Sequence, residues 1–322
     1  MVDRVKFRID NLKHRFIVWF FNTFQRTKQM RVLENKLLKE TPNADFLRGN
    51  SNTERSVEIN DEDLTLKEVL FSCYFINKEN PQTGEVQGVA DFNYIQKWYK
   101  SVVDAELNAI IIHDGIDQDF ISKYTTARIK FRKFIPGCHP LIDERWIIFY
   151  IFLKATQIEK AFFTDIGDVV ITKNPFHLIS SKNQFFIGRD NARKIRLSGW
   201  ILNEISQFQD ESNVKLPKSF FYQSLYNVGI VGGNRKVMLF MLSHYIDYLL
   251  TTNCNTYKEM TVFNILVHEY FFPKLTYAPY ESVVVNPNSD SSATHEYLIS
   301  GFPLNSAFKG FENDSKAYFI HK

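Results

Sequence analysis

The chain has few cysteines and no long apolar run, and both absences exclude broad classes of protein. Its 322 residues include three cysteines, which lie far apart and form no Cys-x-x-Cys pair. This spacing argues against a disulfide framework and a thiolate zinc site, so we expect a reducing compartment, the cytoplasm. No stretch of about 18 apolar residues occurs, so no transmembrane helix is expected. The run Phe16–Phe21 is too short for the core of a secretory signal.

Several catalytic and binding signatures are missing as well. The chain contains no Gly-x-Gly-x-x-Gly, P-loop, Gly-x-Ser-x-Gly or His-Glu-x-x-His motif. The net charge is only +3, and aromatic and basic residues are not interleaved in the second half. We therefore do not expect nucleic acid as a partner.

The basic residues that are present gather near the beginning of the chain. Residues 1–40 carry ten Lys or Arg against four Asp or Glu, around the apolar run Phe16–Phe21. A basic helix with aromatics at its middle suits an anionic membrane surface, while packing on a neighbouring domain is the alternative. Residues 41–63 are polar and lack periodicity, which predicts a linker or loop. We therefore divide the chain into an N-terminal segment, 1–63, and a catalytic domain, 64–322.

From Leu64 onward, apolar strands alternate with amphipathic helices. The pattern predicts strands at 69–76, 108–113, 128–134, 161–164, 184–188 and 227–231. It predicts helices at 92–103, 143–155, 195–207, 236–250 and 258–271. Such alternation indicates an α/β domain with a mostly parallel sheet and helices on both faces. Ligands of these sheets bind at the carboxyl ends of the strands.

The most informative segment is Ala161-Phe-Phe-Thr-Asp-Ile-Gly-Asp-Val-Val-Ile-Thr-Lys-Asn-Pro-Phe176. An apolar strand runs into Asp165, and Asp168 follows three residues later. Two carboxylates at the end of a buried strand are costly unless a positive charge lies between them. Mn²⁺ or Mg²⁺, which bind carboxylate and diphosphate oxygens, are the expected cofactors. Turn and cap residues are the alternative interpretation of this pair.

This segment resembles the acidic motif of GT-A fold glycosyltransferases, in the variant with two residues between the acids and Asn-Pro-Phe after them. The resemblance implies a single GT-A, Rossmann-like domain that moves a sugar from a nucleotide-sugar donor. It also implies that the motif ends a central strand and holds the metal on the donor diphosphate. The usual motif has one spacer residue, so we expect Asp168 to bind the metal directly. Asp165 is then a ribose or water-mediated contact.

Further segments match the same resemblance in chain order. Asn227-Val-Gly-Ile-Val-Gly-Gly233 is similar to the strand that lines the sugar pocket, and Lys258-Glu-Met-Thr-Val-Phe-Asn264 to a helix start that carries an acid. His321 resembles the late histidine that ligates the metal in many such enzymes. The implied metal ligands are Asp165, Asp168 and His321; the donor contacts are Arg145, Asp165, Asn227, Gly232, Gly233 and Lys322; the candidate bases are Asp190 and Glu259.

The resemblance leaves several questions open. Neither the donor sugar nor the stereochemistry of transfer can be inferred, and the acceptor is expected to be a glycan or a lipid-linked sugar, in surface polysaccharide or glycoconjugate synthesis. A non-catalytic sugar-binding module is one rival. A nucleotidyltransferase that makes the nucleotide-sugar is another, although residues 80–88 lack the Arg or Lys that its loop requires.

Overall fold

The computed structural model describes residues 56–77, 79, 84–137, 139–179, 185–252, 258–271, 282–285, 298–299 and 317–321. The basic segment 1–40, for which the sequence predicts a helix, lies outside them. Among the helices of the described part, none has the length and apolar character needed to cross a membrane.

The described strands form a large sheet and a small one. The strands are β1 (Ser56–Val57), β2 (Glu68–Tyr74), β3 (Ala109–His113), β4 (Ile129–Ile135), β5 (Lys160–Thr164), β6 (Val169–Ile171), β7 (Phe185–Lys194), β8 (Ser224–Asn234), β9 (Ser282–Val285), β10 (Leu298–Ile299) and β11 (Ala317–His321). The large sheet has the order β1-β4-β3-β2-β5-β8-β7-β9, and the small sheet the order β10-β11-β6.

Strand directions confirm the mostly parallel sheet that the sequence predicts. Strands β4, β3, β2 and β5 are parallel neighbours. Strand β8 is antiparallel to both β5 and β7, so β7 runs in the same direction as those four. Strands β1 and β9 oppose their neighbours. Five of the eight strands of the large sheet therefore share one direction.

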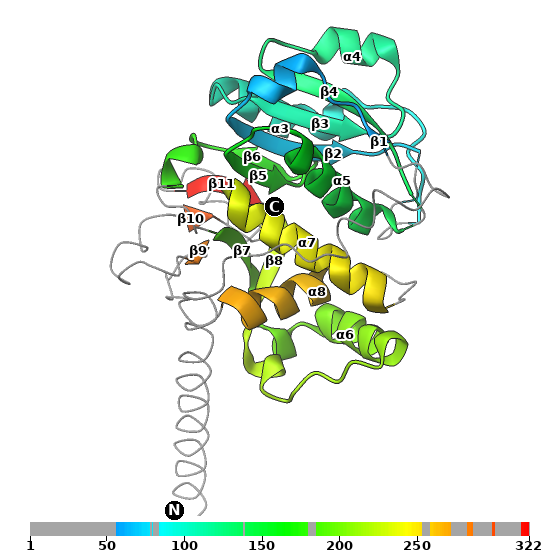
Figure 1. Ribbon diagram of the computed structural model, residues 1–322, viewed down its shortest axis with the longest axis vertical. Helices are drawn as coiled ribbons and strands as arrows, with labels where there is room; N and C mark the ends of the chain where they lie inside the picture. Colours follow the sequence, from blue (N-terminus) through cyan, green and yellow to red (C-terminus); the bar gives the residue numbers. More distant parts are fainter. Residues whose placement is uncertain are drawn as a thin grey trace, which may run out of the picture.

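The helices lie on both faces of this sheet (Figure 1). They are α3 (Phe92–Asp104), α4 (Gln118–Tyr124), α5 (Leu141–Ala155), α6 (Gly199–Ser212), α7 (Arg235–Thr252) and α8 (Glu259–Leu266). Helices α5, α6, α7 and α8 contribute to one hydrophobic core. Helices α3 and α4 and the small sheet contribute to the other.

The middle of strand β5, Ala161–Phe163, is apolar because both faces of the sheet are covered there. Ala161 and Phe163 face the first core and Phe162 faces the second. Successive side chains of a strand point to opposite faces, so a strand covered on both sides needs apolar residues at every position. The same covering buries the strand end where the acidic motif begins.

The small sheet lies against α3 and brings a distant part of the chain beside the acidic motif. Strand β11 pairs antiparallel with β6, and His321 lies opposite Val169, the residue after Asp168. Phe319 of β11 is fully buried in the second core, where its ring lies 5.2 Å from that of Phe162. This apolar contact fixes the position of His321.

The sheet includes residues that the sequence analysis assigned to the polar linker. Ser56 and Val57 pair with the end of β4. Asp63, in the short η1 helix (Asp61–Thr65), is fully buried and accepts hydrogen bonds from Arg132 of β4 at 2.7 and 2.9 Å. A buried carboxylate needs such a partner, and this ion pair attaches the segment before β2 to the sheet.

Candidate metal and donor site

A cleft of about 1070 Å³ lies at the edge of the sheet where β2 and β5 end. Tyr74 and Thr164, the last residues of these parallel strands, both line it. Strand β8 runs the opposite way, and its residues Asn227–Gly229 reach the same edge. The cleft thus lies where the carboxyl ends of parallel strands place a ligand.

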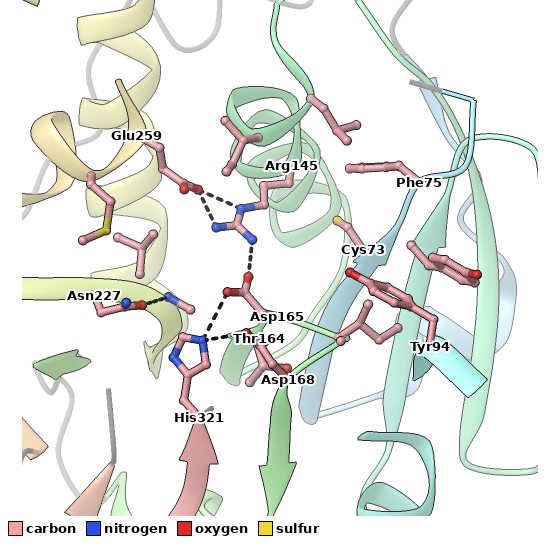
Figure 2. Close-up of a pocket in the computed structure, with 18 of the residues that line it drawn as sticks. Cys73, Phe75, Tyr94, Arg145, Thr164, Asp165, Asp168, Asn227, Glu259 and His321 are labelled. Atoms are coloured by element: carbon pink, nitrogen blue, oxygen red, sulfur yellow. Dashed lines mark hydrogen bonds and ion pairs between the residues drawn. The ribbon is translucent and has the colours of Figure 1, made fainter. Parts of the chain in front are cut away.

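The three residues expected to bind metal lie together in this cleft (Figure 2). Asp165 directly follows β5, and its backbone N–H donates to the Gly229 carbonyl at 2.9 Å. Asp168 precedes β6, and His321 ends the neighbouring strand β11. The sheet register therefore brings these three side chains to one point.

The spacing of their ligand atoms fits one divalent cation. One ligand atom from each residue lies within 4.8 Å of the others. His321 Nε2 is 3.3 Å from Asp168 Oδ2 and 3.7 Å from Asp165 Oδ2. Ligand atoms at right angles around an ion with bonds of about 2.1 Å are about 3 Å apart, so these separations suit a shared ion.

Gly229 gives the cluster its room. A Cβ atom built on Gly229 would overlap the His321 ring and lie 2.7 Å from Asp165 Oδ2. Glycine permits this close approach of a strand backbone to two ligand side chains. The site thus requires glycine for space, whatever ion it holds.

Arg145 of α5 links the cluster to the opposite wall (Figure 2). Its guanidinium makes an ion pair with Asp165, and its Nε and Nη2 atoms lie 2.8 and 2.6 Å from Glu259 Oε1. Burial acts to raise the pKa of Asp165, but Arg145 and then His321 outweigh it and hold that pKa below its usual value. Asp165 is therefore an anion in the folded protein.

Glu259 is tied to Arg145 rather than presented to solvent. Its side chain is 1% exposed, and Oε1 also accepts a hydrogen bond from the Trp146 indole. Burial raises its pKa to about 8, although the neighbouring Arg145 acts in the opposite direction. With one oxygen engaged by these donors, Glu259 is placed to orient Arg145.

Aromatic residues form the far wall of the cleft. Tyr74 and Tyr94 stack with ring centroids 5.4 Å apart, and Gly167 lies so close that an added Cβ would be 2.8 Å from the Tyr94 ring. Asp114 follows β3 at the same edge of the sheet but does not contribute its side chain to this wall. Its carboxylate instead accepts hydrogen bonds from the backbone N–H groups of Ile76 and Asn77 at 2.7 and 3.0 Å.

The remaining predicted residues differ in their positions. Asn227 lines the cleft, and its side-chain oxygen accepts from the Gly229 N–H at 2.8 Å. Gly232 and Gly233 do not line it: they pair with Phe162 and Ala161 within the sheet, and a Cβ on Gly232 would overlap the Phe162 ring. Aromatic packing therefore accounts for Gly232.

Two predicted residues have no described side chain. Asp190 lies in β7, of which only the backbone is described at this position. Lys322 lies outside the described residues. Their roles as base and donor contact stay predictions.

The predicted site omitted several residues of the cleft lining, among them Tyr94 and Trp200, and it included Gly229 only as part of the pocket strand Asn227–Gly233. Tyr94 and Trp200 are each 48% exposed although they are large aromatics on amphipathic helices. Each lies one helical turn before a buried residue, Trp98 or Glu204, and an exposed aromatic at the border of a buried helix face is a usable signal for a ligand-facing residue. Gly229 differs from its neighbouring glycines only by the strand register, which the sequence does not reveal.

Neither a protein-family model nor a curated protein sequence matches this chain. Among solved structures, galactosyltransferase LgtC in complex with donor and acceptor sugar analogues is 14% identical, with a TM-score of 0.36 over 62% of this chain and 70% of LgtC. The glycosyltransferase GlyE of Streptococcus pneumoniae TIGR4 is also 14% identical, with a TM-score of 0.34 over 63% of this chain and 43% of GlyE.

Proposed function

We propose that this chain is a metal-dependent glycosyltransferase that uses a nucleotide-sugar donor. The observation that carries the proposal is the convergence of Asp165, Asp168 and His321 beside Gly229, at the strand ends that border a large cleft. The ordered motifs that resemble GT-A enzymes supply these same residues. Carboxylate and imidazole ligands at this spacing suit Mn²⁺ or Mg²⁺.

Different residues of the cleft would contact the diphosphate and the nucleoside of the donor. A bound cation would act as a Lewis acid that stabilises the departing nucleoside diphosphate. Arg145 keeps Asp165 ionised and oriented, and Glu259 fixes the guanidinium of Arg145. Tyr94, which is half-exposed and stacks on the buried Tyr74, offers an aromatic surface for the nucleoside.

The acceptor hydroxyl requires a base if transfer inverts the anomeric centre. Glu259 accepts hydrogen bonds from Arg145 and Trp146, which favours an orienting role for it. Asp190 is the remaining candidate for the base. A retaining reaction needs no dedicated base. The loss or survival of transfer after replacement of Asp190 therefore also indicates whether the reaction inverts or retains the anomeric centre.

A donor screen tests the proposal directly. Full-length protein is incubated with Mn²⁺ and a panel of nucleotide-sugars, and nucleoside diphosphate release is measured with and without a chelator. We expect release from one donor, abolished by chelation and by Asp168→Asn. Binding of a nucleotide-sugar without turnover, in every acceptor mixture tried, would favour the sugar-binding module. Pyrophosphate release from a nucleoside triphosphate and a sugar phosphate would favour the nucleotidyltransferase.

A further inference from the structure

Trp200 is an exposed aromatic residue in an unusual position. It lies in the first turn of α6, lines the cleft, and is 48% exposed. Large indole side chains are otherwise buried in the described core, as Trp98 and Trp146 are at 0% and 1% exposure. A half-exposed indole inside a cleft is typical of a surface that contacts a ligand.

Helix α6 is joined to α8 one helical turn after Trp200. Glu204, one helical turn after Trp200 on the same side of the helix, is 3% exposed and accepts the Thr261 backbone N–H at 2.6 Å. This bond supplies the N-terminus of α8 with a cap, since the side chain of its own N-cap residue, Lys258, makes no capping hydrogen bond. The orientation of α6 is therefore fixed by a buried hydrogen bond between the two helices.

The same junction contributes a second residue to the lining of the cleft. Met260 directly precedes Thr261 and lines the cleft. Trp200 and Met260 thus both belong to the wall that α6, α8 and the start of β8 build, across the metal cluster from Tyr74 and Tyr94. If the nucleoside lies on the tyrosine wall, the wall with Trp200 faces the acceptor.

We propose that Trp200 forms the platform on which a pyranose ring of the acceptor stacks. This inference rests on the proposed function, because it assigns the second substrate of the same cleft. A pyranose presents a face of C–H groups to an indole and directs its hydroxyl groups outward from the ring edge. Those hydroxyls can then meet polar groups of the same wall.

The polar groups of this wall favour a sugar over a hydrocarbon chain. Asn227, which is half-buried, lines the cleft together with Trp200. A lipid chain would remove its side-chain amide from water and offer it no hydrogen bond, which costs free energy. A sugar ring provides hydrogen-bonding groups, so it satisfies both the indole and its polar neighbours.

The test observes Trp200 itself. Full-length protein is labelled with fluorotryptophan, and the signals of its four tryptophans are recorded by fluorine NMR, with Trp200→Phe identifying the Trp200 signal. Maltose, cellobiose and lactose are titrated in the presence of Mn²⁺ and a nucleoside diphosphate, and hexanol is the hydrocarbon probe. We expect at least one disaccharide to shift the Trp200 signal, and Trp200→Ala to weaken its binding roughly tenfold.

The matched control is Leu197→Ala, which removes an exposed apolar side chain (62% exposed) just before α6 and outside the cleft lining. It should bind the disaccharide like the unaltered protein. The platform is overturned if no disaccharide shifts Trp200, if only hexanol does, or if Trp200→Ala binds sugar with full affinity. A disaccharide shift in a protein that turns over no nucleotide-sugar would instead reject the proposed transfer and retain the sugar platform.

Discussion

The two carboxylates of the metal cluster have different neighbours, which gives them different mutational consequences. Asp165 pairs with Arg145, whereas Asp168 is 45% exposed and lies 3.3 Å from His321. Asp168→Asn removes a ligand charge without opening a buried ion pair. We expect Mn²⁺ affinity and sugar transfer to fall at least about 100-fold, while the free energy of unfolding changes by less than about 1 kcal/mol.

Calorimetric titration of Mn²⁺ and urea unfolding measure these effects. Asp104→Asn, an exposed carboxylate at the end of α3, is the matched control and should change neither. Near-normal Mn²⁺ affinity in Asp168→Asn would remove Asp168 from the ligand set.

Gly229 is the most constrained glycine of the site. In Gly229→Ala the new methyl group must displace His321 or Asp165, because both lie within its van der Waals reach. We expect Mn²⁺ affinity to fall at least about tenfold, since a displacement of about 1 Å spoils a ligand set. Gly199→Ala is the control, where an added Cβ meets nothing within 4 Å. Equal Mn²⁺ affinity in the two variants would show that the cluster tolerates the methyl group.

At the level of single residues, the sequence reveals only what local spacing carries. Asp165 and Asp168 could be predicted because an apolar strand leads into them over consecutive residues. The sequence could not show that Gly229 adjoins the cluster while Gly232 packs on Phe162, because that depends on the β5–β8 register. The Arg145–Glu259 contact joins α5 to α8 and was likewise hidden.

Helices α6 and α8 meet through buried acidic groups, which makes their contact sensitive to pH. Burial raises the pKa of Glu204 from its ordinary 4.5 to about 7, while Thr261 and Lys258 act to lower it and Asp143 to raise it. The folded state therefore binds a proton more tightly than the unfolded state between these values. Stability contributed by the protonated carboxyl is present below pH 4.5 and is lost as pH rises toward 7.

Glu204→Gln should flatten this dependence. The amide keeps an oxygen for the Thr261 N–H and has no charge to bury, so the variant should be the more stable protein above pH 7, by a few kcal/mol. Urea unfolding at a series of pH values measures the difference. Asp143, whose pKa burial raises to about 6, retains part of the slope in the variant. Parallel stability profiles for the two proteins would contradict the prediction.

Among the elements, long periodic segments could be predicted and their ends could not. The helix predicted at 195–207 is a short turn, η3 (Ile195–Leu197), followed by α6, because the Ser198 side chain caps the N-terminus of α6 by accepting from the Ile201 N–H. Strand β8 is longer than predicted, since pairing with both β5 and β7 extends it. Helix α4 has seven residues and no buried one, so the hydrophobic pattern did not reveal it.

For the whole molecule, we propose that the charge of the N-terminal segment governs association with a membrane. Residues 1–40 carry ten basic and four acidic residues, and each Lys or Arg near an anionic surface contributes roughly 1 kcal/mol. We expect the full-length protein to sediment with anionic liposomes at low salt and to be released at high salt. Replacing Lys13, Arg15, Arg26 and Lys28 by Gln should abolish sedimentation. Indifference of the unaltered protein to such liposomes would favour a packing role for the segment.

The architecture as a whole was predictable to the level of class. Alternating strands and helices predict a mostly parallel sheet, and short crossovers account for the neighbours β2, β3 and β4 but not for β5, which lies beside β2. The antiparallel partner β8 and the small sheet depend on contacts between segments far apart in the chain. Apolar pattern alone does not encode such contacts. The sequence therefore predicted His321 as a metal ligand, but not the strand β11 that carries it or the pairing of β11 with β6.

Strand β11 has a consequence for how the fold responds to its ligand. It carries His321 to a cluster whose other members lie before β6, so one ion would bridge segments widely separated along the chain. If the ion binds only when β11 is paired with β6, then binding of the ion also stabilises that pairing, by thermodynamic linkage. A bound cation would then stabilise the pairing of β11 with β6. We expect hydrogen exchange in β11 to be faster when a chelator is present, while exchange in β2 and β3 is unchanged. The concentration of available metal would thereby set the stability of the small sheet.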